Sequence, residues 1–147
     1  MEHVVIRQRR YVETGKVPPE LNVLVQTNSK KTPTPLPLKL AENEIVWLKW
    51  SQSSIVAKAK ILTWFSGIAK NVEEIRVHTK GTDLFNIDDY WKDLASNKFD
   101  SGICHYIVIK MKDEEWLSHP IYPKTRSFGS SWIYLDSKSK RQEWLSI

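Results

Sequence analysis

Two neighbouring segments in the middle of the chain restrict the possible folds more than any other feature. Ile45–Trp50 and Ile55–Ile61 are rich in β-branched and aromatic residues, and the polar stretch Ser51–Ser54 separates them. From Ile55 onward every second residue is apolar or small, whereas Lys58 and Lys60 fall on the opposite face, which is the period of a strand. The pattern predicts a β-hairpin joined by a short polar turn. Because the inward residues include alanines, we expect a tightly curved sheet or a small barrel.

Shorter signals place further strands and helices on either side of this hairpin. The order along the chain is strands, a helical insertion and then strands again, with no internal repeat or heptad pattern. We therefore predict one domain over residues 1–147 with an α+β, mainly β fold. The additional strands are expected at Val4–Ile6, Leu21–Gln26, His105–Met111 and Ser131–Leu135, and the helices at Val72–Arg76, Asp89–Leu94 and Lys138–Leu145.

Composition narrows the classes of function. No apolar run approaches the roughly 20 residues that a membrane span requires, and the apolar stretch near the N-terminus is too short for a signal peptide. Cys104 is the single cysteine and cannot form an internal disulfide, so we expect a cytoplasmic protein. The net charge of +5 favours phosphate-bearing partners. Of the seven tryptophans, we assign about four or five to the core.

Motifs for catalysis or metal binding are missing from the sequence. It contains no nucleophile elbow, no phosphate-cradling glycine loop and no histidine pair at metal-binding spacing. Cys104 and His105 are adjacent on an expected strand, so their side chains point to opposite faces and do not form a catalytic pair. The paired acids Asp88–Asp89 and Glu114–Glu115 fit helix starts and turns. We therefore expect a binding domain rather than an enzyme, with no catalytic residue, no cofactor and no metal.

Three polar and aromatic stretches point to nucleic-acid binding. The hairpin turn offers hydroxyl and amide groups suited to reading base edges, the end of the second hairpin strand adds aromatic rings, and a later loop combines cations, hydroxyls and an aromatic ring. Cations and backbone amides hold phosphates, while aromatic rings stack on bases. We expect these stretches to converge on one concave surface. The candidate residues are Trp50, Ser51, Gln52, Ser53, Lys58, Lys60, Trp64, Phe65, Lys124, Arg126, Ser127, Phe128 and Ser130.

Each candidate is given a role in this interpretation. The hairpin lysines, Lys124 and Arg126 neutralise phosphates. A base stacks on Trp50, Trp64 or Phe128, and a good stacking contact is worth about 1–3 kcal/mol. The edge of the base is read by Gln52 together with Ser127 or Ser130.

At these segments the sequence resembles the PUA-like superfamily, the small pseudobarrels that include PUA, ASCH and EVE domains. The resemblance implies a curved pseudobarrel of five to six strands with short helices at its openings, and RNA or modified DNA bound in a cleft between barrel and helices. The Gly-x-Lys-x-x-Glu-x-Arg motif of ASCH domains is not present with that spacing, so we assign no branch. The segments that carry the resemblance are Leu21–Val25, Glu44–Lys49, Ile55–Ile61, Asp88–Trp91 and His105–Ile109.

The sequence thus predicts a nucleic-acid-binding domain that recognises RNA, or a modified or flipped base in DNA, through a basic, aromatic-lined cleft. Its expected partners are RNA or DNA and other components of a nucleic-acid processing or restriction system, and no membrane. One alternative is a small amidohydrolase acting on a modified nucleoside such as acetylcytidine, in which Lys16 or Lys124 works with an acid such as Glu20. Another is a protein-interaction module, which requires an exposed apolar patch and no basic cleft.

Overall fold

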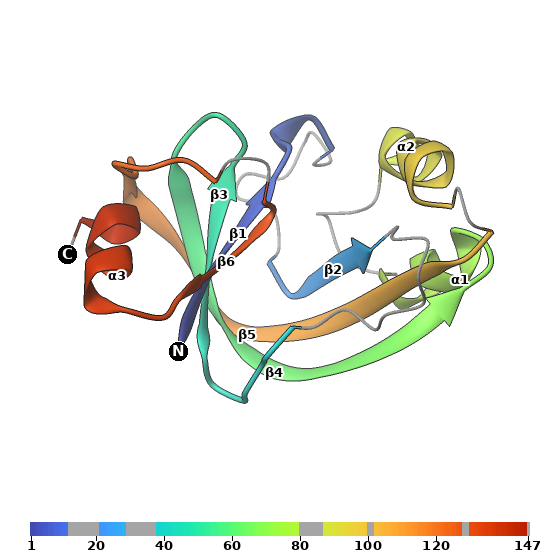
Figure 1. Cartoon of the computed structure of the whole chain (residues 1–147), viewed down its shortest axis with the longest axis horizontal. Coiled ribbons are helices and arrows are strands. Elements are labelled where there is room, and N and C mark those ends of the chain that lie inside the picture. The colour runs from blue at the N-terminus through green and yellow to red at the C-terminus, as the bar shows by residue number, and fades with distance from the viewer. Residues whose placement is uncertain (12–20, 29–37, 80–86, 100–101, 128–129, 147) are drawn as a thin grey trace.

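The computed structural model describes residues 1–11, 21–28, 38–79, 87–99, 102–127 and 130–146. Strands dominate, and the helices are short (Figure 1). In chain order the elements are β1 Glu2–Arg7, the 3-10 helix η1 Arg9–Tyr11, β2 Val23–Asn28, β3 Ile45–Trp50, β4 Ile55–Ala69, α1 Glu73–Arg76, the 3-10 helix η2 Val77–Thr79, α2 Asp88–Lys98, β5 Cys104–Ile121, β6 Trp132–Leu135 and α3 Lys138–Leu145.

The strands form one curled sheet of six strands in the order β2-β5-β4-β3-β1-β6. The β1 and β3 strands run parallel, and every other neighbouring pair is antiparallel. The sheet coils into a half-barrel, with α3 against one side and α1 and α2 beyond the other (Figure 1). This architecture confirms the predicted α+β, mainly β pseudobarrel with short helices near its openings.

The central hairpin has the predicted arrangement. The β3 and β4 strands pair from Ile45 opposite Lys60 to Lys49 opposite Ile55, with a register shift after Leu48. The alternate residues of β4 that were expected to face inward are buried, and Ala57 is completely inaccessible to solvent. Small side chains at these positions let the strands approach closely, as a tightly curved sheet requires.

Two strands run much further than the sequence predicts. The β4 strand continues eight residues beyond Ile61, to Ala69, and β5 continues ten residues beyond Met111, to Ile121. The acids Glu114 and Glu115, predicted to mark a helix start or turn, lie inside β5, so that prediction is wrong. Glu114 is tolerated there because its carboxylate is exposed and accepts a hydrogen bond from the backbone N–H of Leu21 at 2.5 Å.

The hydrophobic core has two parts. The larger cluster fills the barrel and extends under α2, which contributes Trp91 and Leu94. The smaller cluster lies between the sheet and α3, and Trp47 of β3 packs there with Trp144 of α3. Five of the seven tryptophans are buried, as predicted, whereas Trp116 is half-buried and Trp64 is exposed.

The helices begin where the sequence indicates. The acids Asp88 and Asp89 lie in the first turn of α2, where negative charge is favourable. Arg76 of α1 donates a hydrogen bond to Asp88 at 2.8 Å and lowers the pKa of that carboxyl, which ties the two helices together. Ser137 caps α3 by accepting a hydrogen bond from the N–H of Lys140 at 3.1 Å. Among the described residues, none of the helices has the length and apolar character needed to cross a membrane.

Candidate nucleic-acid interface

One end of the barrel collects several of the polar segments that the sequence singled out. We call it the arginine end, because β1 ends there at Arg7, beside the end of β3 at Trp50 and the start of β6 at Trp132. The backbone N–H of Ser51 donates to the carbonyl of Arg7 at 2.7 Å. The N–H of Ile6 donates to the carbonyl of Ser131 at 2.9 Å. The turn after β3 and the loop before β6 therefore meet at the end of β1.

Arg7, the last residue of β1, is half-buried at this end. Its guanidinium donates to the carbonyl of Ile6 at 3.0 Å, to the carbonyl of Val25 at 2.8 Å and to the side-chain oxygen of Gln26 at 2.8 Å. Burial lowers the pKa of Arg7, but guanidinium groups start so high that it stays charged at neutral pH. The site therefore contains a fixed positive charge held on several hydrogen bonds.

The side-chain amide of Gln26 connects Arg7 to the loop that precedes β6. Its side-chain nitrogen donates to the hydroxyl of Ser131 at 2.8 Å, while its oxygen accepts from Arg7. These two bonds fix the orientation of the amide, because each of its polar ends has a partner of the right kind. The Arg7–Gln26–Ser131 chain thus links β1, β2 and the loop that precedes β6.

A pair of tyrosines lies beside this network. Burial raises the pKa of Tyr90, on α2, to about 12, while the nearby charge of Arg7 works in the opposite direction. Tyr90 therefore stays protonated across the physiological range. The ring of Tyr11 meets the ring of Tyr90 edge to face, with centroids 5.3 Å apart. The hydroxyl of Tyr11 donates to Asp93, also on α2.

The rim of this region carries a second arginine. Arg10 donates to the hydroxyl of Tyr11 at 2.6 Å and lies over the Tyr11 ring at 4.3 Å from its centroid. Next to it is a cavity of about 140 Å³ between η1 and α2. That volume is smaller than the roughly 300–1,000 Å³ of ordinary ligand pockets, so it suits a single ring-sized group. The cavity is lined by Tyr11, Tyr90, Asp93, Leu94, Asn97 and Lys98.

The hairpin turn reaches the arginine end, but not all of it is accessible. Ser51, Gln52 and Ser53 are exposed, and Gln52 adopts a left-handed conformation with φ of 59°. Trp50 is only 7% exposed and packs against Trp116, with ring centroids 6.2 Å apart. The stacking role predicted for Trp50 does not fit this placement, because its ring belongs to the core.

The predicted cationic loop begins beside the hairpin turn, since it follows Ile121, which pairs with Ile55, and it leads to Ser131 at the arginine end. Lys124 and Arg126 are exposed, and the N–H of Lys124 donates to the carbonyl of Glu143 at 2.8 Å, which ties the loop to α3.

Two serines complete the described part of this loop. The N–H of Ser130 donates to the carbonyl of Ser127 at 3.1 Å, and the Ser130 hydroxyl donates to the carbonyl of Trp132 at 3.0 Å. Phe128, predicted to stack on a base, lies outside the described residues.

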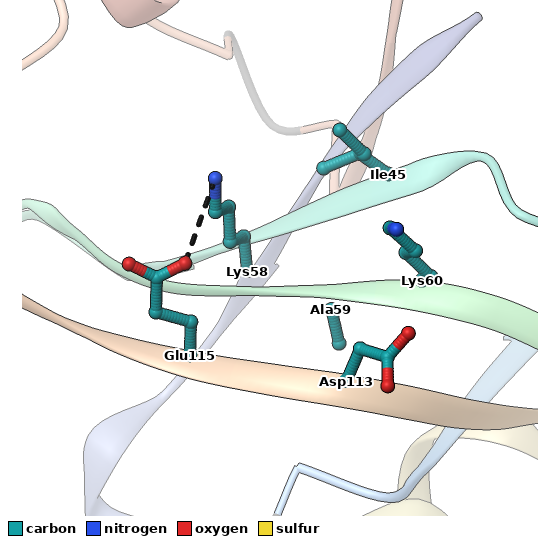
Figure 2. A pocket seen from close by; sticks show the side chains of 6 residues that line it. All are labelled: Ile45, Lys58, Ala59, Lys60, Asp113 and Glu115. Carbon is teal, nitrogen blue, oxygen red and sulfur yellow. Dashed lines mark ion pairs between the residues drawn. The ribbon is translucent and has the colours of Figure 1, made fainter.

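The hairpin lysines face a different part of the surface (Figure 2). Lys60 pairs with Ile45, the first residue of β3, and therefore lies at the opposite end of the barrel from Arg7. Lys58 forms an ion pair with Glu115 at 3.6 Å, and Asp113 lines the same pocket as Lys60. This pocket measures about 330 Å³ and carries opposite charges, as the cavity beside Arg10 does with Asp93 and Lys98. What separates the two hairpin lysines from the arginine end is therefore their position.

The aromatic pair at the predicted end of the second hairpin strand is also elsewhere. Trp64 and Phe65 are successive residues of β4, so their side chains point to opposite faces of the sheet, and both are exposed. Phe65 meets the ring of His78 edge to face at 4.8 Å. Both residues lie on the part of β4 that extends beyond its pairing with β3. The predicted convergence therefore includes the turn and the loop but excludes Lys58, Lys60, Trp64 and Phe65.

Several residues of the arginine end were not predicted as site residues. Arg7, Arg10 and Tyr11 belong to a cluster rich in arginine that directly follows the expected strand Val4–Ile6, and this clustering was the available signal. Gln26 and Tyr90 carried no such signal, because an isolated glutamine in a strand and a tyrosine in a short helix are ordinary residues. Only the closure of the sheet brings them next to Arg7.

The residues of the hydrolase alternative are not assembled in the described part of the chain. Lys16 and Glu20 lie outside the described residues. Lys124 is exposed, and the ion pairs of the described residues do not include it. Within the same residues, no group of three or more His, Cys, Asp and Glu side chains is placed to hold a metal ion.

The fold matches solved structures over almost its whole length. Crystal structures of the ASCH protein from Zymomonas mobilis superpose with TM-scores of 0.61 and 0.62, at 16% sequence identity, covering 99% of this chain and 94–97% of theirs. The chain therefore has an ASCH-like fold. Two of these structures carry a serine-to-alanine or a tyrosine-to-phenylalanine substitution. No family model matches the sequence, and no curated protein matches it significantly. At this level of identity the ASCH likeness establishes the fold alone.

Proposed function

We propose that this ASCH-like domain binds nucleic acid, either RNA or a modified or flipped base in DNA, at the arginine end of its barrel. The observation that carries the proposal is the hydrogen-bonded chain from Ser131 through Gln26 to the half-buried Arg7, beside Tyr90. It brings a fixed positive charge, an oriented amide and an aromatic helix face to one place. These are the groups that hold a phosphate and read or stack a base.

The cations around this network supply the electrostatic part of binding. Arg9 and Arg10 extend from the end of β1, and Lys124 and Arg126 lie on the loop that Ser131 anchors, all four exposed. Neutralising phosphates releases condensed counterions, so each contact adds affinity that depends on salt. Arg7 acts differently: its guanidinium is held by three acceptors and supplies positive potential to the site rather than a mobile phosphate contact.

The groups that would meet a base are the tyrosines and the polar turn. The ring of Tyr11 borders the small cavity next to α2, and its hydroxyl is held by Arg10 and Asp93. A flat ring held in this way has little freedom to lose when a base stacks on it. The exposed side chains of the Ser51–Ser53 turn offer further donors and acceptors at the end of β1, where the N–H of Ser51 bonds to the Arg7 carbonyl.

Equilibrium binding of fluorescently labelled single-stranded RNA and DNA, followed by anisotropy, tests this proposal. We expect Arg10→Ala and Arg126→Ala each to weaken binding on the order of fivefold at low salt, as the loss of a phosphate contact does. Lys60→Ala is the matched control, because it removes one positive charge at the opposite end of the barrel. Equal losses in all three variants would point to net charge alone, and binding unchanged in both arginine variants would refute the assignment of the site.

A further inference from the structure

The outer half of β4 is paired on one side only. From Thr63, opposite Lys110, to Ala69, opposite Cys104, it pairs with β5 in regular register. On its other side the last pair with β3 is Lys60 opposite Ile45. In the part of the chain that the structure describes, no strand pairs with this side of β4 beyond that point, and Figure 1 shows β4 at the outside of the ribbon that it forms with β5.

This edge lacks the usual protection against pairing with another strand. Natural proteins guard exposed edges with charged residues, prolines or bulges, because unpaired N–H and C=O groups recruit other strands. Between Lys60 and Lys70 the sequence contains no charged residue and no proline. The register shift between Ile61 and Thr63 precedes the free edge and does not interrupt it.

The same edge exposes apolar side chains at a regular spacing. Leu62 is 44% exposed, Trp64 38% and Ile68 58%. Because the register is regular from Thr63 onward, Trp64, Ser66 and Ile68 lie on one face of the strand. Trp64 and Ile68 therefore stand at equal distances on either side of Ser66.

We propose that the outer half of β4 pairs antiparallel with the same segment of a second copy, about a two-fold axis at Ser66. This register places Trp64 of each copy opposite Ile68 of the other, so the dimer contains two such pairs. Aromatic and β-branched residues directly opposite each other are favourable cross-strand pairs. Phe65 then meets Gly67 of the second copy on the other face.

A second copy fits this edge better than an unrelated strand, because the pattern is symmetric about its own centre. A two-fold interface requires a surface that complements itself, and the spacing of Trp64 and Ile68 around Ser66 provides that. The segment brings no charge into the contact, so the net charge of +5 on each copy is kept outside it. The interface leaves the arginine end free and does not depend on nucleic-acid binding.

Sedimentation velocity over a range of protein concentrations tests the pairing. We expect the native chain to reach the mass of a dimer as its concentration rises to about 200 µM, and Ile68→Lys and Trp64→Lys to remain monomers. Tyr122→Lys is the matched control, since Tyr122 is the most exposed large hydrophobic residue of the described chain, at 71%, and lies outside β4. This variant should still dimerise. Circular dichroism confirms that each variant is folded.

A cysteine at the proposed axis tests the register itself. Ser66→Cys should form an intermolecular disulfide under mild oxidation, because the two side chains face each other there, whereas Ser118→Cys, on exposed β5, should not. The native Cys104 is buried and does not compete. A native chain that stays monomeric at every concentration overturns the proposal and leaves the edge to a strand of another protein. A dimer that survives Ile68→Lys and Trp64→Lys overturns it as well.

Discussion

The guanidinium of Arg7 and the side-chain oxygen of Gln26 lie 2.8 Å apart, although their strands are far from each other in the sheet. The β2 strand forms one edge of the sheet, and β1 is next to the opposite edge. Arg7 also donates to the carbonyl of Val25, a backbone group on the edge strand. One hydrogen-bonded cation therefore joins the two edges of the barrel at the candidate interface.

Removing this cation should destabilise the fold. Arg7→Met keeps most of the apolar stem but leaves the Val25 carbonyl and the Gln26 amide without their donor, so we expect a loss of about 3 kcal/mol in the free energy of unfolding. Urea denaturation measures this loss. Arg9→Met is the control: Arg9 is exposed, and its replacement should change stability by less than about 0.5 kcal/mol. Equal stability of the two variants would show that Arg7 does not close the barrel.

A buried histidine makes stability sensitive to acid. His3 is inaccessible to solvent, with one ring nitrogen 3.1 Å from a carboxylate oxygen of Glu44, and the other accepting a hydrogen bond from the Trp132 indole at 3.1 Å. Burial lowers the pKa of His3 below its ordinary value of 6.5. His3 therefore takes up a proton at a higher pH in the unfolded chain than in the folded protein. The stability that comes from keeping His3 neutral is complete above pH 6.5 and is lost as the pH falls.

The effect should appear in the pH dependence of unfolding. Between about pH 7 and 5 we expect the free energy of unfolding to fall more steeply for the native chain than for His3→Asn. His119→Asn is the comparison, because His119 is exposed, and it should keep the native slope. The prediction would be contradicted if the free energy of unfolding of His3→Asn fell with pH as steeply as that of the native chain.

Gly67, in the part of β4 that extends beyond its pairing with β3, has no room for a side chain. A Cβ atom added at Gly67 would lie 2.7 Å from the hydroxyl oxygen of Tyr106 and 2.8 Å from its Cζ atom. The Tyr106 ring cannot easily move aside, since it stacks on His78 with centroids 6.0 Å apart. Gly67→Ala should therefore cost about 1–3 kcal/mol of stability. In a Tyr106→Ala background the same change should cost much less, and a double-mutant cycle of denaturation midpoints checks this difference.

Two aromatic residues outside the core, Tyr11 and Phe65, should differ in their effect on nucleic-acid binding. Tyr11 borders the cavity at the arginine end, whereas Phe65 lies on the ribbon. Losing a stacking contact of about 1–3 kcal/mol would make Tyr11→Ala bind RNA at least fivefold more weakly. Phe65→Ala should bind as the native chain does. The opposite order, measured by anisotropy at one salt concentration, would move the base-binding region to the ribbon.

The sequence predicted the elements whose two faces differ in polarity. The β3 strand, the start of β4 and α3 have the predicted bounds, because apolar and polar residues alternate with the period of each structure. The extensions of β4 and β5 could not be predicted in this way. The added part of β4 is exposed at nearly every residue before Ala69, and the added part of β5 carries charged and exposed residues, so the two-residue period that identifies a strand fades.

The residues of the candidate site were harder to predict than the strands and helices, because tertiary structure brings them together. The exposed turn at Ser51–Ser53 and the loop with Arg126 were predicted from composition, and both lie at the arginine end. Trp50 was assigned to base stacking, although a tryptophan at the end of an apolar strand fits a core position equally well. The partnership of Arg7 with Gln26 arises from sheet closure between distant segments, and no local pattern encodes it.

The salt dependence of single-stranded RNA affinity tests the central claim most directly. We predict a linear fall of log K with log salt in the native chain, and a slope shallower by about 0.7 for each phosphate contact removed, so that Arg10→Ala/Arg126→Ala loses about 1.4. Lys58→Ala/Lys60→Ala removes the same charge elsewhere and should keep the native slope. A shallow native slope, or an equal change in both double variants, would contradict binding at the arginine end.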